Sequence, residues 1–439
     1  MNQNGHMSVA RPHVARTLDW IPPLAVATGL AHRDGALCLL SDPRVPNSRS
    51  YVAVDPDLVT VTNTAPGQVF DALHDPRFAV GTIGLAAYDA GARAATGPRE
   101  IVWPDLILAR YPTILAFDHD AQTVTAHGWG ESETLAKAAC DRAETWVAQA
   151  LMPTLPKPPT SAFTPKGPDS IYLDDVATVV ARIKAGDLFQ ANIARGWTGT
   201  LDQSADTFDV FARLALVSDA AFGAFWRIGD RVLVSNSPEL FVALDITTRR
   251  VETRPIKGTR PRHPDPIQDA AAAADLMASA KDRAENLMIV DLMRNDLARV
   301  CTPGSVSTSA LFTLESLPSV HHLVSTVSGT LASGQTPADL LEASFPPGSI
   351  TGAPKHQAMK VIADLEPPRG AWCGSLFVLD AEGNLTASVL IRTASFERRD
   401  GIWHFRALAG AGIVADSDPA SELAETEVKI SALKAAFVG

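Results

Sequence analysis

Hydrophobic positions along the chain switch several times between helical and strand-like spacing. Residues 172–185 carry apolar side chains three and four positions apart, and the pattern stops at Gly186, so this segment is predicted to be a helix. The following residues, 188–196, alternate as a strand does, which places Gln190 and Asn192 together on one face. The two amides therefore point away from the apolar side chains of that strand.

Other segments show the same two periods. Helices are predicted for residues 134–151 and 270–297, and a last helix is predicted to begin at Pro419 with Asp418 as its N-cap. Apolar runs bounded by turn residues predict strands at 80–87, 106–117, 231–235, 239–244, 320–331, 386–396 and 403–408. Helices and strands are intermixed without strict β-α-β alternation, so the predicted fold class is α+β.

A proline-rich segment divides the chain. Six prolines lie between Met152 and Pro168, and such a segment can hold neither a helix nor a central strand. We therefore expect an amino-terminal lobe at residues 15–151, a linker at 152–168 and a carboxy-terminal region at 169–439.

Composition limits the classes of function. Of 439 residues, 46% are hydrophobic and 20% are charged, which suits a large core and excludes disorder. The net charge of −11 argues against a nucleic-acid partner or a basic membrane anchor, so an anionic ligand needs a local cationic pocket. The sequence contains neither an apolar leader nor an apolar run of 18 residues, and a cytoplasmic location is expected. The four cysteines suit neither a CxxC metal site nor a disulfide framework.

The densest cationic segment is 249–262, which contains Lys257 in a Pro-Ile-Lys-Gly-Thr turn. One interpretation is a solvated basic loop. The other is an anion site in which neighbouring positive charges lower the pKa of Lys257 and make it a nucleophile. An unperturbed lysine has only ~0.04% free amine at pH 7, and lowering its pKa to about 8 requires roughly 3 kcal/mol.

Acidic residues form stripes on two predicted helices. Asp282 and Glu285 lie on one, and Glu422, Glu425 and Lys429 lie on the other. Considered singly, these stripes are explained by ordinary surface ion pairs. If the two stripes face each other, four carboxylates make an oxygen-rich site that suits Mg²⁺ shared with a ligand carboxylate.

Single residues add further candidates. Glu239 at a strand start is an exposed edge residue or, in a dry cavity, a general acid with a raised pKa. His322 is either structural or a donor toward a ligand. Arg392, which alternates inside a predicted strand, is costly there unless it meets an anion, so it is a candidate carboxylate clamp. Gly410 and Gly412 lie in a glycine-rich loop, which is either a plain turn or a close approach of backbone N–H groups to an anion.

Taken together, these segments resemble the chorismate-utilising enzymes, which include the large subunits of anthranilate and aminodeoxychorismate synthases and the isochorismate and salicylate synthases. The resemblance rests on ordered motifs between residues 170 and 437: GDLFQAN (186–192), SPE (237–239), PIKGTR (255–260), DRAENL (282–287), RNDL (294–297), HLVS (322–325), GSITGAPK (348–355), WCGS (372–375), IRT (391–393) and ELAETEVK (422–429). It implies the anthranilate synthase component I-like fold, with mixed sheets packed together and flanked by helices, and a chorismate-binding catalytic region at 169–439.

Two positions discriminate within that family. Isochorismate and salicylate synthases place a water-activating lysine where this chain has Gln190, and an amide cannot deprotonate water. Anthranilate synthases carry alanine where Lys257 stands. The resemblance therefore favours the aminodeoxychorismate synthases, with anthranilate synthase component I as the nearest alternative and a noncatalytic anion-binding scaffold as an alternative of another class.

The resemblance also implies roles for individual residues. Lys257 attacks C2 of chorismate, Glu239 protonates the departing C4 hydroxyl, and ammonia then adds at C4 and expels the lysine. The product is 4-amino-4-deoxychorismate, an intermediate toward 4-aminobenzoate and folate. His322 completes the catalytic set. The substrate-binding set is Gln190, Gly258, Thr259, Trp372, Arg392, Gly410, Gly412 and Lys429, and Mg²⁺ is held by Glu285, Glu425, Glu422 and Asp282.

Ammonia needs a source. No Gly-x-Cys-x-Gly nucleophile turn surrounds any cysteine, so a separate glutamine amidotransferase small subunit is expected as the partner. The lyase that releases pyruvate from the product is expected to be another protein.

Overall fold

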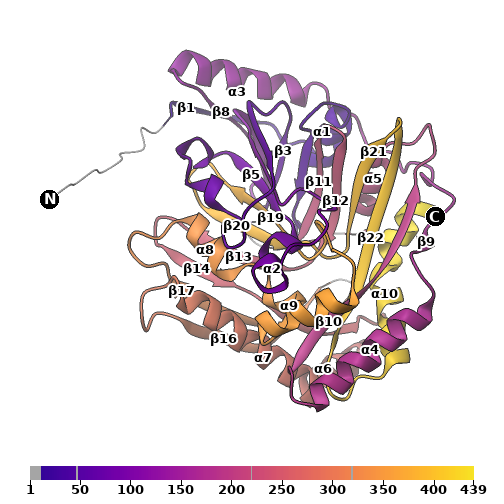
Figure 1. Cartoon of the computed structure of the whole chain (residues 1–439). Coiled ribbons are helices and arrows are strands. Elements are labelled where there is room, and N and C mark those ends of the chain that lie inside the picture. The colour runs from indigo at the N-terminus through magenta and orange to yellow at the C-terminus, as the bar shows by residue number, and fades with distance from the viewer. Residues whose placement is uncertain (1–10, 46–47, 219, 318–319) are drawn as a thin grey trace.

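The computed structural model describes residues 11–45, 48–218, 220–317 and 320–439. Two large antiparallel sheets pack against each other, and helices cover their outer faces (Figure 1). The first sheet has the order β1 (His13–Leu18), β8 (Thr123–Trp129), β7 (Thr113–Asp118), β3 (Arg49–Ala53), β2 (Leu37–Leu40), β11 (Phe222–Ile228), β12 (Arg231–Ser237), β21 (Thr393–Arg399), β22 (Ile402–Ile413), β10 (Gln190–Thr200) and β18 (Gly352–Ala353), with β9 (Thr164–Pro165) beside β10.

The second sheet has the order β15 (Ile256–Pro261), β17 (Val320–Thr330), β14 (Arg250–Thr253), β13 (Leu240–Asp245), β20 (Leu385–Val389), β19 (Ser375–Leu379), β5 (Thr82–Ala86), β6 (Leu106–Arg110) and β4 (Leu58–Thr62), with β16 (Ser307–Ser316) beside β17. The helices are α1 (Pro23–Leu30), α2 (Tyr88–Thr96), α3 (Glu133–Val147), α4 (Asp169–Lys184), α5 (Thr207–Val217), α6 (Pro266–Ala278), α7 (Ala280–Ala298), α8 (Pro337–Ser344), α9 (Lys355–Leu365) and α10 (Pro419–Val438).

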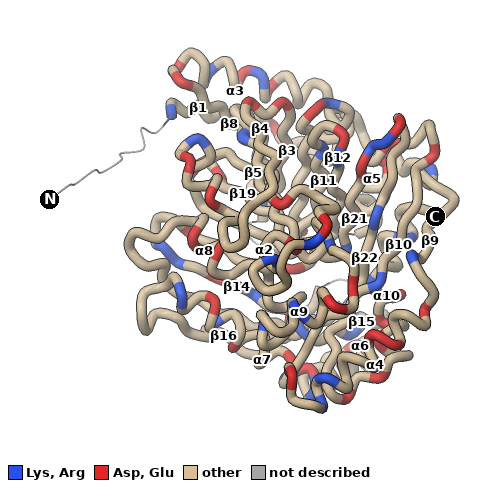
Figure 2. The backbone as a smooth tube through the Cα atoms, in the orientation of Figure 1, with Lys and Arg blue, Asp and Glu red and all other residues tan. Residues whose placement is uncertain are grey.

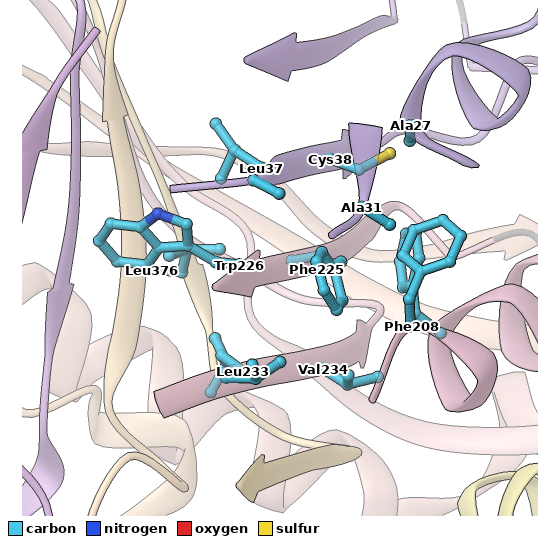
Figure 3. Packing of buried hydrophobic residues seen from close by; sticks show 14 of the residues in the cluster. Ala27, Ala31, Leu37, Cys38, Phe208, Phe225, Trp226, Leu233, Val234 and Leu376 are labelled. Carbon is cyan, nitrogen blue, oxygen red and sulfur yellow. The ribbon is translucent and has the colours of Figure 1, made fainter. Parts of the chain in front are cut away.

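The main core lies between the sheets. Trp226 and Leu233 from neighbouring strands of the first sheet pack near Leu376 of the second, and Phe208 of α5 closes one end (Figure 3). A smaller core lies on the outer side of β10 and β22, where residues such as Ala191 and Ile193 pack against α4 and α9. Apolar burial on this outer face leaves Gln190 and Asn192 on the inner face, as the alternation predicts.

Both sheets combine strands from the two sides of the proline-rich segment. In the first sheet β2 of the amino-terminal lobe pairs with β11, and in the second β5 pairs with β19. Residues 152–168 contain only the two-residue strand β9 and no helix. The lobe and the carboxy-terminal region therefore share their sheets and their core.

Four predicted elements are wrong in detail. The single strand 106–117 is split into β6 of the second sheet and β7 of the first, because the chain leaves the strand conformation at Tyr111 and Pro112. The single helix 270–297 is two helices, because Ser279 adopts an extended conformation and its side chain caps α7 by accepting a hydrogen bond from the Asp282 N–H. The single strand 386–396 is split into β20 and β21. Gly410 and Gly412 lie inside the long strand β22 and not in a loop, since their lack of a Cβ lets β10 side chains lie over them.

Within the described residues, no helix is both long and apolar enough to cross a lipid bilayer. All four cysteines are buried and unpaired. Acidic and basic positions are interspersed along the visible backbone, with both signs on α4 (Figure 2).

We expect Phe377→Ala to lower the free energy of unfolding by about 3–5 kcal/mol. Phe377 is fully buried on β19, and its ring covers Gly84 of β5, where an added Cβ would lie 2.0 Å from the Phe377 Cζ atom. Truncation leaves a cavity where β5 of the amino-terminal lobe pairs with β19 of the carboxy-terminal region. Urea unfolding measures the change, with exposed Leu311→Ala as the control, and a loss as small as the control's would contradict the prediction.

Candidate active site

The site forms where the chain passes from one sheet to the other. Glu239 lies between β12 of the first sheet and β13 of the second, and Arg392 lies between β20 of the second and β21 of the first. The two crossings are joined by backbone hydrogen bonds: the Asn236 N–H donates to the Arg392 carbonyl at 3.0 Å, and the Val389 N–H donates to the Glu239 carbonyl at 3.1 Å. Hydrogen bonding between the crossings holds the carboxyl of Glu239 and the guanidinium of Arg392 in one site.

Arg392 was predicted to sit inside a continuous strand, and this was wrong. Its backbone has a φ of 51°, in the left-handed region that side-chain-bearing residues seldom adopt. This conformation breaks the strand and turns the side chain toward the site, where Glu239 interacts with it electrostatically. Among the described residues, Arg392 forms no ion pair within 4.0 Å.

Lys257 lies on β15, next to a register shift between Ile256 and Thr259. Burial lowers the pKa of the Lys257 amine, and the positive charge of Lys429 lowers it further, while the carboxylates of Glu285, Glu239 and Glu425 oppose the shift. The free-amine form is therefore favoured by removal from water more than by any neighbouring cation.

The predicted cause of that shift was wrong. The arginines that flank Lys257 in the sequence are each paired with an acid: Arg254 with Glu315, Arg260 with Asp275 and Asp282, and Arg262 with Asp269. None of these arginines is among the charged groups that shift the pKa of Lys257. The cation near Lys257 comes from α10, more than 170 residues further along the chain.

Glu239 is buried, with 5% of its surface exposed. Burial raises the pKa of its carboxyl, and a hydrogen bond with Ser349 and the charges of Lys257, Lys429 and Arg392 limit the rise. The carboxyl can therefore hold a proton at a pH at which a surface glutamate is ionised. A protonated Glu239 beside an unprotonated Lys257 is an acid and a nucleophile in one site.

The floor of the site is the inner face of β10 and β22. A Cβ built on Gly412 would lie 2.3 Å from Gln190 Nε2 and 3.5 Å from Lys257 Nζ. A Cβ on Gly410 would lie 2.7 Å from Asn192 Oδ1 and 3.1 Å from Trp372 Cη2. These two positions require glycine because the polar side chains of β10 and Lys257 converge over them.

Lys429 connects this floor to the acidic helices. Its ammonium donates to the Gly410 carbonyl at 2.9 Å and pairs with Glu425 at 2.6 Å. Glu285 of α7 and Glu425 of α10 both interact electrostatically with Lys257, so the two predicted stripes face the same site. Burial raises the pKa of Glu285 and of Glu422, and the neighbouring carboxylate Glu425 adds to both shifts.

The four carboxylates do not form a preassembled metal cage. Across the described ranges, no group of three or more His, Cys, Asp or Glu side chains converges closely enough to hold an ion. Asp282 is engaged by Arg260 at 3.1 Å, and Glu285 has Lys281 at 4.0 Å. Each helix contributes a pair of carboxylates, and the two pairs do not close around a single ion position.

His322 lies on β17 opposite Thr259, whose hydroxyl is 2.9 Å from the imidazole Nδ1. Burial, with the positive charge of Arg392, lowers the pKa of His322 to about 4. The ring is therefore neutral at pH 7 and acts as a hydrogen-bonding group. Gly258, between Lys257 and Thr259, has a φ of 86°, and an added Cβ would lie 3.0 Å from Asp282.

The structure thus brings together the catalytic, substrate-binding and acidic residues that the sequence singled out, and their roles stay predictions. It adds residues that sequence analysis did not propose. Ser349 bonds to Glu239, and Arg369 with Glu366 forms a buried pair behind the floor. The GSITGAPK motif points to Ser349, but only the fold shows what Arg369 touches.

Comparison with known proteins identifies the family. Residues 55–435 match the family described as chorismate binding enzyme. The chain belongs to this family. A protein from Klebsiella aerogenes named aminodeoxychorismate synthase component 1 is 42% identical over 361 residues, which cover 81% of this chain and 76% of that protein. The protein of the same name from Escherichia coli K12 is 40% identical over 363 residues, covering 81% and 77%.

A solved structure shares the fold. The crystal structure of anthranilate synthase component I from Streptococcus pneumoniae TIGR4 has a TM-score of 0.75 and 25% identity, and the match covers 89% of this chain and 92% of that one. The predicted α+β class and the anthranilate synthase component I-like fold are confirmed.

We expect Lys257 to react with acetic anhydride at a lower pH than exposed Lys137 does, because burial lowers the pKa of Lys257. The Lys429→Met substitution removes a nearby positive charge and frees Glu425, so the pKa of Lys257 should rise. Peptide mass spectrometry across a pH series measures both effects. Lys434→Met, on the same helix and exposed, is the control. An unchanged Lys257 profile in Lys429→Met would contradict the electrostatic assignment.

Proposed function

We propose that this protein is the component 1 subunit of an aminodeoxychorismate synthase. It converts chorismate and ammonia to 4-amino-4-deoxychorismate through an intermediate bound to Lys257. The observation that carries the proposal is the pairing of a partly buried lysine of lowered pKa with a buried glutamate of raised pKa. The two relatives of about 40% identity that bear this name support it.

The first step forms a bond between Lys257 Nζ and C2 of chorismate. Both ring double bonds shift toward C4, the C4–O bond breaks, and Glu239 donates its proton so that water leaves. In the second step ammonia bonds to C4, the double bonds shift back, and the C2–Nζ bond breaks to restore the lysine amine. The proton lost by the new ammonium group returns to the Glu239 carboxylate, which closes the cycle.

Two cations are suited to hold the substrate's carboxylates. Arg392 carries an unneutralised guanidinium that interacts with Glu239, and Lys429 projects over the floor. A bound carboxylate would gain a charge-assisted hydrogen bond from either group. His322, in its neutral form, would hold the Thr259 hydroxyl in place.

Mg²⁺ fits the chemistry of the acidic stripes. Magnesium is usually held by one or two carboxylates together with water and substrate oxygens, and it needs no closed protein cage. Glu285 and Glu425 would hold it, with Glu422 and Asp282 nearby. Bound there, it would neutralise the carboxylates and the substrate's ring carboxylate. Burial raises the pKa of Glu285 and of Glu422 despite nearby lysines, so a bound cation would favour the ionised form of both carboxyls.

The name "component 1" in the relatives implies a second component. We propose that it is a glutamine amidotransferase that supplies the ammonia. Anthranilate synthase component I is the rival function, because a solved protein of that name shares the fold at 25% identity.

The product assay tests the proposal. With chorismate, Mg²⁺ and ammonium chloride at alkaline pH, we expect 4-amino-4-deoxychorismate, which a separately purified lyase converts to 4-aminobenzoate. Chromatography with fluorescence detection measures 4-aminobenzoate and anthranilate. Anthranilate formed without the lyase would support the rival, and no turnover at saturating ammonia and Mg²⁺ would support a noncatalytic scaffold.

The nucleophile can be trapped. After brief exposure to chorismate and Mg²⁺ without ammonia, denaturing mass spectrometry should show an adduct on the peptide that contains Lys257, since the second step cannot proceed. Lys257→Ala should abolish the adduct, whereas Lys360→Ala, on the exposed side of α9, should retain it. An adduct that persists in Lys257→Ala would place the nucleophile elsewhere.

Removal of single carboxylates tests the metal proposal. Glu285→Gln and Glu425→Gln should each raise the Mg²⁺ concentration required for half-maximal binding about tenfold or more. Isothermal titration of the protein with Mg²⁺ in the presence of chorismate measures this. Glu427→Gln changes a carboxylate of the same helix that pairs with Arg195 and should bind as the wild type does. Equal affinity in all variants would move the metal away from these helices.

A further inference from the structure

Arg369 lies in the core behind the floor of the site, with only 1% of its surface exposed. Its Nε and Nη2 atoms each donate to the carboxylate of Glu366 at 2.9 Å. Glu366 is also buried and accepts from the Ala194 N–H of β10 at 2.8 Å. A buried ion pair loses much of its attraction to lost hydration, so stability alone is a weak reason for it. The other contacts of the guanidinium therefore indicate what the pair does.

The guanidinium is fixed in both position and orientation. Its Nη2 atom also donates to the backbone carbonyl of Asn192 on β10 at 2.6 Å. Its Cζ atom lies 4.6 Å from the ring centre of Tyr88 and 5.1 Å from that of Trp372. A planar guanidinium with several fixed acceptors and aromatic contacts has little freedom to turn. Arg369 is therefore a rigid extension of the strand.

One donor of Arg369 reaches the turn that carries the hydrogen-bond partner of Glu239. Its Nη1 atom donates to the Ile350 carbonyl at 3.2 Å. Ile350 ends the 3₁₀ turn η3 (Gly348–Ile350), which also contains Ser349. Ser349 hydrogen-bonds the buried carboxyl of Glu239. A turn of three residues has little hydrogen bonding of its own, so its position depends on the groups that hold it.

Two successive carbonyls at the end of this turn are attached to β10. The Thr351 carbonyl accepts directly from the Asn192 N–H at 2.9 Å, and β18 then continues as a partner of β10. The Ile350 carbonyl is attached to the same strand through Arg369. A single attachment leaves the turn free to pivot, whereas two neighbouring attachments fix its direction. The direction of Ser349 toward the site therefore follows from the second attachment.

We propose that Arg369 is a positioning residue that places the Ser349 hydroxyl against the carboxyl of Glu239. This inference rests on the proposed function, in which Glu239 protonates the departing C4 hydroxyl. Arg369 keeps its charge and its hydrogen bonds throughout the reaction and acts only through Ser349. The effect is large because a displacement of about 1 Å at a reacting group costs about a hundredfold in rate.

The Arg369→Lys substitution tests the inference. Lysine keeps the positive charge beside Glu366 but loses the planar set of donors that includes the bond to the Ile350 carbonyl. Without ammonia, we expect the Lys257 adduct to form from chorismate about tenfold more slowly or worse, because proton donation is misaligned. The chorismate concentration that gives half-maximal adduct formation should change by less than about twofold. Quenched-flow mass spectrometry measures both quantities.

The Arg227→Lys substitution is the matched control. Arg227 is a buried arginine that pairs with Asp206 at 2.6 Å, donates to the Ala31 carbonyl at 3.1 Å and lies 5.5 Å from the ring centre of Trp403. It lies near the end of β11 opposite to the one that pairs with Ser237. This variant should lose stability to urea as Arg369→Lys does and form the adduct at the wild-type rate.

A double variant shows whether Arg369 acts through Ser349. If it does, Arg369→Lys with Ser349→Ala should form the adduct within about twofold of the rate of the slower single variant, because both changes remove the same contact. Losses that multiply would overturn the inference, as would a wild-type rate in folded Arg369→Lys or a change confined to the half-maximal chorismate concentration. If Arg369→Lys does not fold, Glu366→Gln, which removes the charge that holds the guanidinium, is judged by the same outcomes. A wild-type protein that forms no adduct would instead count against the proposed function.

Discussion

Hydrogen bonds between two neighbouring sheet crossings are the constraint on which the site depends. The Ser237 hydroxyl donates to the Val389 carbonyl at 2.5 Å, and backbone bonds join Asn236 to Arg392 and Val389 to Glu239. Each crossing leaves its strand where the sheets separate, so its side chains reach the space between them. An acid and a guanidinium would otherwise have no reason to be buried together in an apolar core.

Burial in that space sets the chemistry. The same removal from water favours the neutral form of both Lys257 and Glu239, which is the protonation state that the proposed mechanism requires of each. The positive charge of Lys429 further lowers the pKa of Lys257 and limits the rise in the pKa of Glu239. The helices that carry the acidic stripes add the opposite charge at the edge of the site, where side chains such as Glu425 are half exposed.

The sequence was sufficient for the family, the α+β class and the residues that gather at the site, because ordered motifs and periodic apolar positions are local signals. It was not sufficient for the features that depend on distant partners. The arginines near Lys257 looked like its electrostatic environment, yet each is paired with an acid on another segment. The strand break at Arg392 and the extended Gly410–Gly412 segment likewise follow from crossings and from β10, which periodicity cannot reveal.

The sharing of both sheets has a consequence for how the chain is made. When the amino-terminal lobe leaves the ribosome, β2 and β5 each lack the neighbour, β11 or β19, that completes them. Nascent chains therefore carry open strand edges until most of the protein has been synthesised, which is when association with other chains is most dangerous. Fragments cut at the proline-rich segment would each lack half of a core, but together they hold complementary edges from which the whole could be rebuilt.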